Sequence, residues 1–217
     1  MKKLVIFDLD GTLIDTIVDL AQSTNHALRT LGFPTHEESS YKFRVGNGIN
    51  KLFERALPEG EKTEANVLRV RKEFIPYYNM HNTDLSRPYP GMEELLAFLQ
   101  QQGIQLAVAS NKYQEATSKI IPYYFPDITF TAILGQREGC PIKPDAAIAE
   151  EIIRIAGVQK TEVLYVGDSG VDMQTGRNAG VDTCGVTWGF RPRTELEQFA
   201  PQYIVDTAEQ LKEIILK

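Results

Sequence analysis

Residues 4–13 read Leu-Val-Ile-Phe-Asp-Leu-Asp-Gly-Thr-Leu, a run of apolar residues followed at once by two carboxylates. An apolar run of this length predicts a short strand that is buried on both faces. Gly11 then supplies a backbone position that tolerates a sharp turn. Open α/β sheets carry their chemistry at the carboxyl ends of their strands, so the stretch predicts such a sheet with acidic groups at one end.

The two carboxylates of this stretch repel each other. Asp8 and Asp10 are separated by one residue, and each disfavours the ionisation of the other unless a cation lies between them. At ~4 Å the repulsion amounts to about 1 kcal/mol in water and about 4 kcal/mol at an effective dielectric constant near 20. A hard divalent ion with oxygen ligands, above all Mg²⁺, would relieve it. The alternative is that both residues only form a turn before a helix.

Three further polar segments stand at the ends of predicted elements. Ser110-Asn111-Lys112 follows the apolar residues 104–109, and Gly167-Asp168-Ser169-Gly170-Val171-Asp172 follows the apolar residues 163–166. Lys143-Pro144-Asp145 precedes a run of helical pattern from residue 146 to 156, and Pro144 suits the first position of a helix. With residues 8–13, these segments span most of the chain.

The four segments, in this order, resemble the four motifs of the haloacid dehalogenase-like hydrolases, a superfamily in which most members are Mg²⁺-dependent phosphatases. The resemblance implies that Asp8 attacks phosphorus to form an aspartyl-phosphate, which water then hydrolyses. It implies that Asp10 protonates the leaving oxygen and later deprotonates the attacking water. Dehalogenases of the superfamily lack this second aspartate, so Asp10 argues for phosphoryl chemistry.

The resemblance also implies a metal site. Mg²⁺ would be held by the Asp8 carboxylate, the Asp10 backbone carbonyl and the Asp168 carboxylate. Asp172 would act indirectly or through water, or would be a plain acidic residue at a helix start. Ser169 is expected to shape or cap its loop.

Two residues of the second motif and one of the third are expected to bind the substrate phosphoryl group. Ser110 would donate its hydroxyl to a phosphoryl oxygen, and the backbone N–H of Asn111 would do the same. Lys143 would stabilise the transferred group by its positive charge. Lys112 is expected to point to solvent.

Apolar runs typical of strands alternate with stretches of helical pattern, which predicts an α/β fold whose Rossmann-like core is a parallel sheet covered by helices. The predicted strands span residues 3–8, 104–109, 130–134, 162–167 and 182–187. Residues 16–85 hold helical patterns but no convincing strand. We therefore expect a hydrolase core formed by residues 1–15 and 86–217, with an inserted all-helical cap domain formed by residues 16–85. The superfamily's C1 cap has this arrangement.

The inserted segment is expected to select the substrate. Residues 43–49, Phe-Arg-Val-Gly-Asn-Gly-Ile, and the following Arg55-Ala56-Leu57 resemble the cap of phosphoglycolate phosphatases. Arg44 could pair with a substrate carboxylate, and Asn47 could either cap the next helix or contact the substrate. Trp188 either shapes the mouth of the site or packs in the core. The resemblance makes 2-phosphoglycolate the expected substrate.

Composition narrows the class of partner. The net charge is −6, so no general basic surface would attract nucleic acid. No apolar run approaches the ~20 residues of a membrane span, and no secretory signal is present, which predicts a cytoplasmic protein. Cys140 and Cys184 lack metal-ligand spacing. The expected partner is a small phosphorylated metabolite, bound by a monomer or a homodimer.

Other functions stay open as alternatives. Within the superfamily these are a pyrophosphatase, a nucleotidase and a β-phosphoglucomutase, the last of which passes the aspartyl-phosphate to a sugar. A receiver domain of the response-regulator type also combines Asp, Mg²⁺, Ser or Thr, and Lys on a parallel sheet. Receivers are shorter, lack a helical insert and carry no acid–base residue two positions after the nucleophile, so Asp10 and residues 16–85 argue against that alternative.

Overall fold

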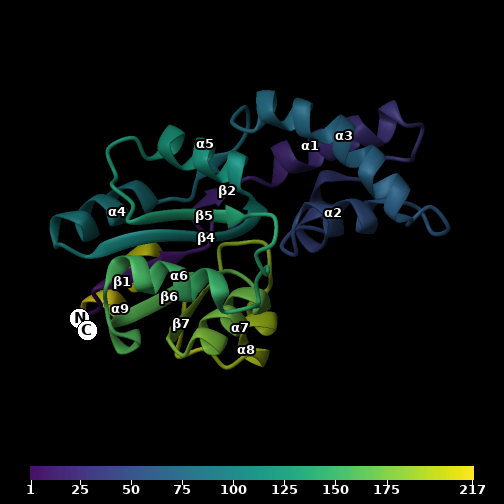
Figure 1. Cartoon of the computed structure of the whole chain (residues 1–217). Helices are drawn as coiled ribbons and strands as arrows, with labels where there is room; N and C mark the ends of the chain where they lie inside the picture. The colour runs from purple at the N-terminus through teal and green to yellow at the C-terminus, as the bar shows by residue number, and fades with distance from the viewer.

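A six-stranded sheet forms the centre of the protein, whose computed structural model describes residues 1–217. The sheet order is β5-β4-β1-β6-β7-β8, and every neighbouring pair is parallel. The predicted α/β fold with a Rossmann-like core is confirmed (Figure 1). The strands are β1 (Leu4–Phe7), β4 (Gln105–Tyr113), β5 (Ala132–Gln136), β6 (Val163–Gly167), β7 (Asp182–Val186) and β8 (Tyr203–Val205).

Helices cover both faces of this sheet because successive side chains of a strand point to opposite faces. In β1, Leu4 and Ile6 pack on one face, whereas Val5 and Phe7 pack on the other, and all four are fully buried. The first face carries α6 (Ala147–Ala156), and the second carries α4 (Met92–Gln101), α5 (Gln114–Tyr124) and α9 (Ala208–Leu216). The remaining elements of this part are the short helix η2 (Lys160–Glu162), α7 (Gly170–Ala179) and α8 (Arg193–Gln198).

Residues 16–85 lie to one side of the sheet and contain helices but no strand, as the sequence predicted (Figure 1). Two-residue strands pair antiparallel where the chain leaves the sheet and where it returns. The apolar faces of these helices continue the hydrophobic core of the second sheet face. The elements are β2 (Ile14–Asp15), α1 (Ile17–Thr30), the 3₁₀ helix η1 (Glu38–Phe43), α2 (Ile49–Ala56), α3 (Glu64–His81) and β3 (Arg87–Pro88).

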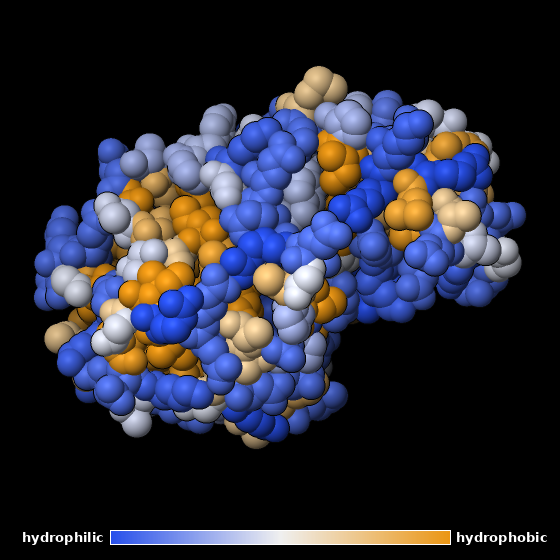
Figure 2. Space-filling view, viewed as in Figure 1, coloured by the Kyte–Doolittle hydropathy of each residue, from blue (hydrophilic) through white to orange (hydrophobic).

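The surface of the molecule shows the same two parts, the sheet with its helices and the helical segment. The space-filling view shows a larger and a smaller lobe, both mostly hydrophilic, with separate apolar patches (Figure 2). None of the helices combines the length and the apolar character that crossing a membrane requires.

Two strands differ most from the prediction, and β5 begins and ends two residues later than predicted. β8 is a sixth strand of only three residues, too short to give a pattern that stands out in the sequence. β4 runs to Tyr113 instead of ending at residue 109, with an irregular register between Ala109 and Tyr113. As a result, residues 110–112 lie inside the strand and are buried.

Candidate active site

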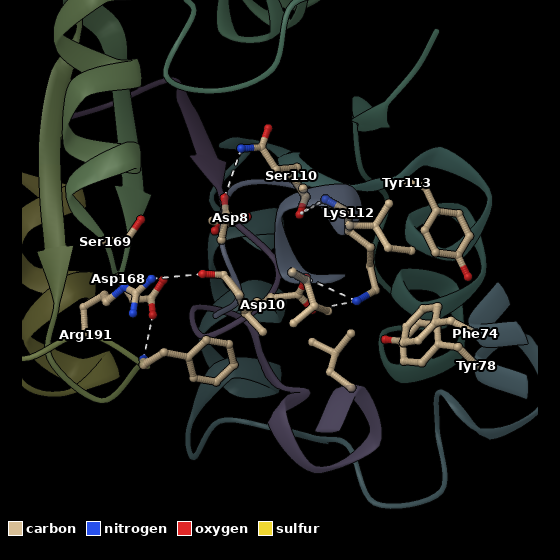
Figure 3. Close-up of a pocket in the computed structure, with 18 residues that line it drawn as sticks. Asp8, Asp10, Phe74, Tyr78, Ser110, Lys112, Tyr113, Asp168, Ser169 and Arg191 are labelled. Atoms are coloured by element: carbon tan, nitrogen blue, oxygen red, sulfur yellow. Dashed lines mark hydrogen bonds and ion pairs between the residues drawn. The ribbon is translucent and has the colours of Figure 1, made fainter. Parts of the chain in front are cut away.

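Three strands bring acidic and polar side chains to one edge of the sheet. Phe7 of β1 pairs in register with Val108 of β4 and with Val166 of β6. The residues that follow therefore meet at the carboxyl ends of these strands, as expected for an open α/β sheet. Asp8, Ser110 and Asp168 line the same cavity there (Figure 3).

Asp8 lies directly after β1 and is only 9% exposed. Its Oδ1 atom accepts a hydrogen bond from the Leu9 N–H at 2.7 Å and lies 3.0 Å from the Lys143 ammonium. Burial, with the nearby Asp172 carboxylate, raises the pKa of Asp8 to about 7, although Lys143 works in the opposite direction. The other oxygen, Oδ2, accepts no hydrogen bond from the protein.

Asp168 follows β6 and is enclosed by backbone. Its Oδ2 atom accepts a hydrogen bond from the Phe190 N–H at 2.6 Å. Burial, together with Asp172 and Asp8, raises the pKa of this carboxyl well above its ordinary value. Gly11 and Gly189 lie so close that a Cβ atom on either would overlap Asp168. These two glycines therefore allow the backbone to approach the carboxylate from two sides.

A buried ion pair, formed by Lys143 and Asp172, lies beside Asp8 and Asp168. The Lys143 ammonium is 1% exposed and lies 2.7 Å from Asp172 Oδ1, and it also donates to the Ala109 carbonyl at 2.9 Å. Burial opposes its charge, but Asp172 and Asp8 outweigh that effect and raise the pKa of Lys143 well above its ordinary value. Lys143 thus stays charged beside Asp8.

Ser169 and Asp172 form the beginning of α7. The Ser169 hydroxyl donates to Asp172 Oδ2 at 2.6 Å, and the two residues form a capping box. The prediction that Ser169 caps its loop is confirmed. Both oxygens of Asp172 are thereby engaged, one with Lys143 and one with Ser169.

The acidic cluster could hold a metal ion. One carboxylate oxygen each of Asp8, Asp168 and Asp172 lie within 4.8 Å of one another. Since the two Asp172 oxygens are already engaged, Asp8 and Asp168 are the members with an oxygen left to bind a cation. Buried like charges whose pKa values are raised fit a hard divalent ion, which prefers carboxylate oxygens.

Asp10 and Lys112 form a second ion pair in the cavity. The Lys112 ammonium lies 2.9 Å from Asp10 Oδ1 and 3.2 Å from Oδ2, and the Thr16 hydroxyl donates to Oδ1 at 2.6 Å. Lys112 is 7% exposed, so the prediction that it points to solvent is wrong. One feature of the sequence could have indicated that Lys112 is buried, namely its spacing of two residues from Ser110. In a strand that extends to Tyr113, this spacing places both side chains on the same side.

Asn111 joins three parts of the chain. Its side-chain N–H₂ donates to the Gly46 carbonyl at 3.0 Å and to the Lys143 carbonyl at 3.1 Å, and its oxygen accepts from the Lys143 N–H at 2.9 Å. The neighbouring Ser110 hydroxyl accepts a hydrogen bond from the Lys112 N–H at 3.2 Å. Asn111 therefore fixes residue 143 to β4 and contacts residues 16–85.

The cavity itself lies between the sheet edge and residues 16–85. It has a volume of about 50 Å³, which gives space for a few water molecules or one small ligand. The sheet edge contributes its charged and polar walls, including Asp8, Asp10, Ser110, Lys112 and Asp168. Residues 16–85 contribute mainly apolar walls, including Leu20, Ile49, Leu52, Phe74 and the ring of Tyr78.

Arg44 and Asn47 do not line this cavity. Arg44 donates to the Ser40 carbonyl at 2.9 Å, and Asn47 Oδ1 accepts from the Arg55 guanidinium at 2.7 Å. A substrate contact by either residue stays a prediction. Trp188 is half-buried and donates its indole N–H to the Thr12 carbonyl at 3.0 Å.

Known proteins are similar to this chain in sequence and in structure. Residues 5–186 match the family of haloacid dehalogenase-like hydrolases. The chain is 34% identical to a phosphoglycolate phosphatase of Mesorhizobium japonicum, over 97% of this chain and 93% of that protein. It is 33% identical to one of Haemophilus influenzae, over 98% of each. It also superposes on a crystal structure of a candidate phosphoglycolate phosphatase from Lactobacillus delbrueckii, with a TM-score of 0.92, 34% identity and 99% of each chain covered.

Proposed function

Because this chain belongs to the haloacid dehalogenase-like hydrolase family, as its four motifs predicted, we propose that it is a Mg²⁺-dependent phosphatase acting through Asp8. Its substrate would be a small phosphate monoester, with 2-phosphoglycolate first among the candidates. One observation carries the proposal: the buried Asp8 carboxylate faces the cavity between the Lys143 ammonium and the Asp168 carboxylate.

Asp8 is the proposed nucleophile. One oxygen of its carboxylate would attack phosphorus while the bond between phosphorus and the leaving oxygen breaks. The product is an aspartyl-phosphate, and attack of water on phosphorus would then release phosphate and restore the carboxylate. The hydrogen bond from Leu9 and the contact with Lys143 hold Oδ1 and so fix the orientation of the carboxylate in the cavity.

Asp10 is the proposed acid and base. It would give a proton to the leaving oxygen in the first step and take one from water in the second. Its position in the wall of the cavity supports this role. Hydrogen bonds from Lys112 and Thr16 would keep the Asp10 carboxylate in place after the first step and before the second.

Lys143, Ser110 and the N–H of Asn111 are the proposed ligands of the phosphoryl oxygens. The Lys143 charge would offset the negative charge that spreads over these oxygens in the transition state. Lys143 cannot turn away easily, because Asp172 and the Ala109 carbonyl fix its ammonium.

Mg²⁺ would be held by Asp8, Asp168 and the backbone carbonyl of Asp10. When bound, a divalent cation would neutralise charge on the phosphoryl group and on the crowded carboxylates. The raised pKa values of Asp8 and Asp168 support this assignment, since a nearby cation would favour their charged forms.

Residues 16–85 are the proposed cap over a core of residues 1–15 and 86–217. The Asn111 side chain and the Arg191 guanidinium bind backbone carbonyls of the segment 42–46 and so join the two parts. The small cavity between them suits a short leaving group and would exclude bulk water during transfer. The curated relatives named phosphoglycolate phosphatase support the choice of substrate.

The test is release of phosphate, with Mg²⁺, from 2-phosphoglycolate, sugar phosphates, nucleotides and pyrophosphate. We expect kcat/KM for 2-phosphoglycolate to exceed the others by about tenfold or more. A flat profile, or a peak on another compound, would discard the named substrate and keep the phosphatase. No release from any compound, in protein shown to be folded, would discard both.

A further inference from the structure

Among the positive charges around the cavity, that of Lys112 keeps an N–H donor for a further anion. Lys143 already contacts Asp8, Asp172 and the Ala109 carbonyl. The two terminal nitrogens of Arg191 donate to the carbonyls of Lys42 and Val45. Lys112 contacts only one carboxylate, that of Asp10, and an ammonium group has three N–H donors.

Lys112 lies at the apolar end of the cavity. Figure 3 shows its side chain reaching from β4 toward Asp10, with Phe74 and Tyr78 of α3 beyond it. The ammonium lies 4.8 Å from the centre of the Tyr78 ring. Leu20 and Leu52 also line the cavity, and neither can meet a polar substituent.

Tyr78 offers a second donor at the same place. Its side chain is fully buried, and its hydroxyl has no hydrogen-bond partner in the protein. Burial raises the pKa of Tyr78 well above its ordinary value, so the hydroxyl keeps its proton. Buried hydroxyl groups are nearly always hydrogen-bonded. This exception belongs to a residue that lines the cavity and whose ring lies beside the Lys112 ammonium.

We propose that Lys112 and Tyr78 bind an anionic group on the leaving part of the substrate, and that this group is a carboxylate. The proposal rests on the phosphatase function given above and assigns the residues that select the substrate. A carboxylate accepts several hydrogen bonds at once, so it can contact the ammonium while Asp10 keeps its own bond to Lys112. Arg44 does not line the cavity.

The test compares 2-phosphoglycolate with ethyl phosphate, which has nearly the same size but lacks the carboxylate. The measured quantity is the ratio of kcat/KM for the two compounds in the wild type, Lys112→Met and Tyr78→Phe. We expect the ratio to fall about 30-fold or more in Lys112→Met and about threefold to tenfold in Tyr78→Phe. The ratio cancels any loss of activity caused by a displaced Asp10, because such a loss affects both compounds equally.

Two controls make the outcome unambiguous. Lys119→Met removes an exposed lysine that pairs with Glu115 and should leave the ratio unchanged. Tyr78→Phe removes only a hydroxyl without partners, so it retains the fold even if Lys112→Met does not. An unchanged ratio in folded variants of an active enzyme overturns the role of Lys112 and Tyr78 alone. A wild type that hydrolyses neither compound overturns the proposed substrate first, and this inference with it.

Discussion

The carboxyl edge of the sheet and the helical segment 16–85 enclose one cavity but contribute to it in different ways. At the sheet edge, charged side chains contact one another directly, as Lys143 does with Asp8 and Asp172. The helical segment contributes apolar side chains and, through Gly46 and Val45, backbone carbonyls that accept hydrogen bonds from the core. The edge is therefore suited to chemistry, and the segment is suited to enclosing and selecting a ligand.

The two regions also differ in what holds them in place. Strand pairing fixes Asp8 and Asp168, and the enclosed pair of Lys143 and Asp172 supports them. The contacts of Asn111 and Arg191 with the helical segment are individual hydrogen bonds to main-chain carbonyls. Substitutions at the edge should therefore abolish turnover, whereas substitutions at the contacts with the segment should change binding moderately.

The largest effect is expected for Asp8→Asn. This nearly isosteric change removes the proposed nucleophile, so kcat should fall by about 10⁴-fold or more while the fold is kept. Phosphate release from 2-phosphoglycolate and a thermal melt measure the two properties. Asp127→Asn, a change at an exposed aspartate on the surface, serves as the control. Activity within tenfold of the wild type would remove Asp8 from its proposed role.

A pair of glycine variants compares the two regions directly. Gly11 at the edge and Gly60 in the helical segment have nearly the same backbone angle, φ of 85° and 87°. Alanine at either should cost roughly 1 to 2 kcal/mol of folding free energy. Only Gly11→Ala would also displace Asp168, since nothing lies near the added Cβ of Gly60. We expect kcat/KM to fall about 100-fold for Gly11→Ala and to stay unchanged for Gly60→Ala; equal losses would contradict the difference between the regions.

The affinity for Mg²⁺ should depend on pH. The pKa of Asp8 is raised to about 7, so this carboxyl holds a proton in the metal-free protein below neutral pH, and the raised pKa of Asp168 favours its protonated form as well. A cation must displace these protons, and its affinity should therefore rise about tenfold or more from pH 5.5 to pH 7.5. Calorimetric titration in two buffers of different ionisation enthalpy would count the protons released. Equal affinity at the two pH values, without proton release, would contradict the proposed site.

The raised pKa of Asp8 also predicts that the stability of the metal-free protein depends on pH. In the unfolded chain Asp8 has its ordinary pKa of 3.8, so between about pH 4 and pH 7 the folded state binds more protons than the unfolded state. The contribution of Asp8 to the free energy of unfolding is therefore lost as the pH rises through this window. Asp8→Asn should weaken this dependence, as thermal melts without Mg²⁺ would show.

The smallest effect is expected where the helical segment contacts the core. Arg191→Ala removes hydrogen bonds to the carbonyls of Lys42 and Val45, so KM for 2-phosphoglycolate should rise about threefold to tenfold, with little change in kcat. Arg193→Ala, which removes exposed ion pairs with Glu197 and Asp206, is the matched control. A loss in kcat as large as that of an edge variant would contradict the division of roles.

The acids of the sheet edge could be predicted from the sequence because each of them follows a strong local pattern. Asp8 and Asp168 come directly after buried apolar strands, and parallel pairing must bring such positions together. Lys143, which no strand precedes, was found only through the order of the four motifs. In the structure, Lys143 of the third motif forms an ion pair with Asp172 of the fourth.

The contacts across the cavity could not be predicted in the same way. Lys112 is buried because β4 continues irregularly past residue 109, and neither the irregularity nor the Asp10 partner is encoded locally. Arg44 binds a carbonyl of its own segment, a choice that depends on how the short helices pack. Tyr78 lies within the segment 16–85 that was predicted to be helical, and only the structure reveals its unpartnered hydroxyl.

The most direct measurement is a single-turnover reaction with 2-phosphoglycolate and Mg²⁺, quenched in acid before the turnover is complete and followed by peptide mass analysis. The proposed mechanism predicts a phosphoryl group on the side chain of Asp8, absent from Asp8→Asn and from a sample quenched after the substrate is consumed. Turnover at the full rate without a phosphorylated peptide, or with the phosphoryl group on another residue, would contradict Asp8 as the nucleophile.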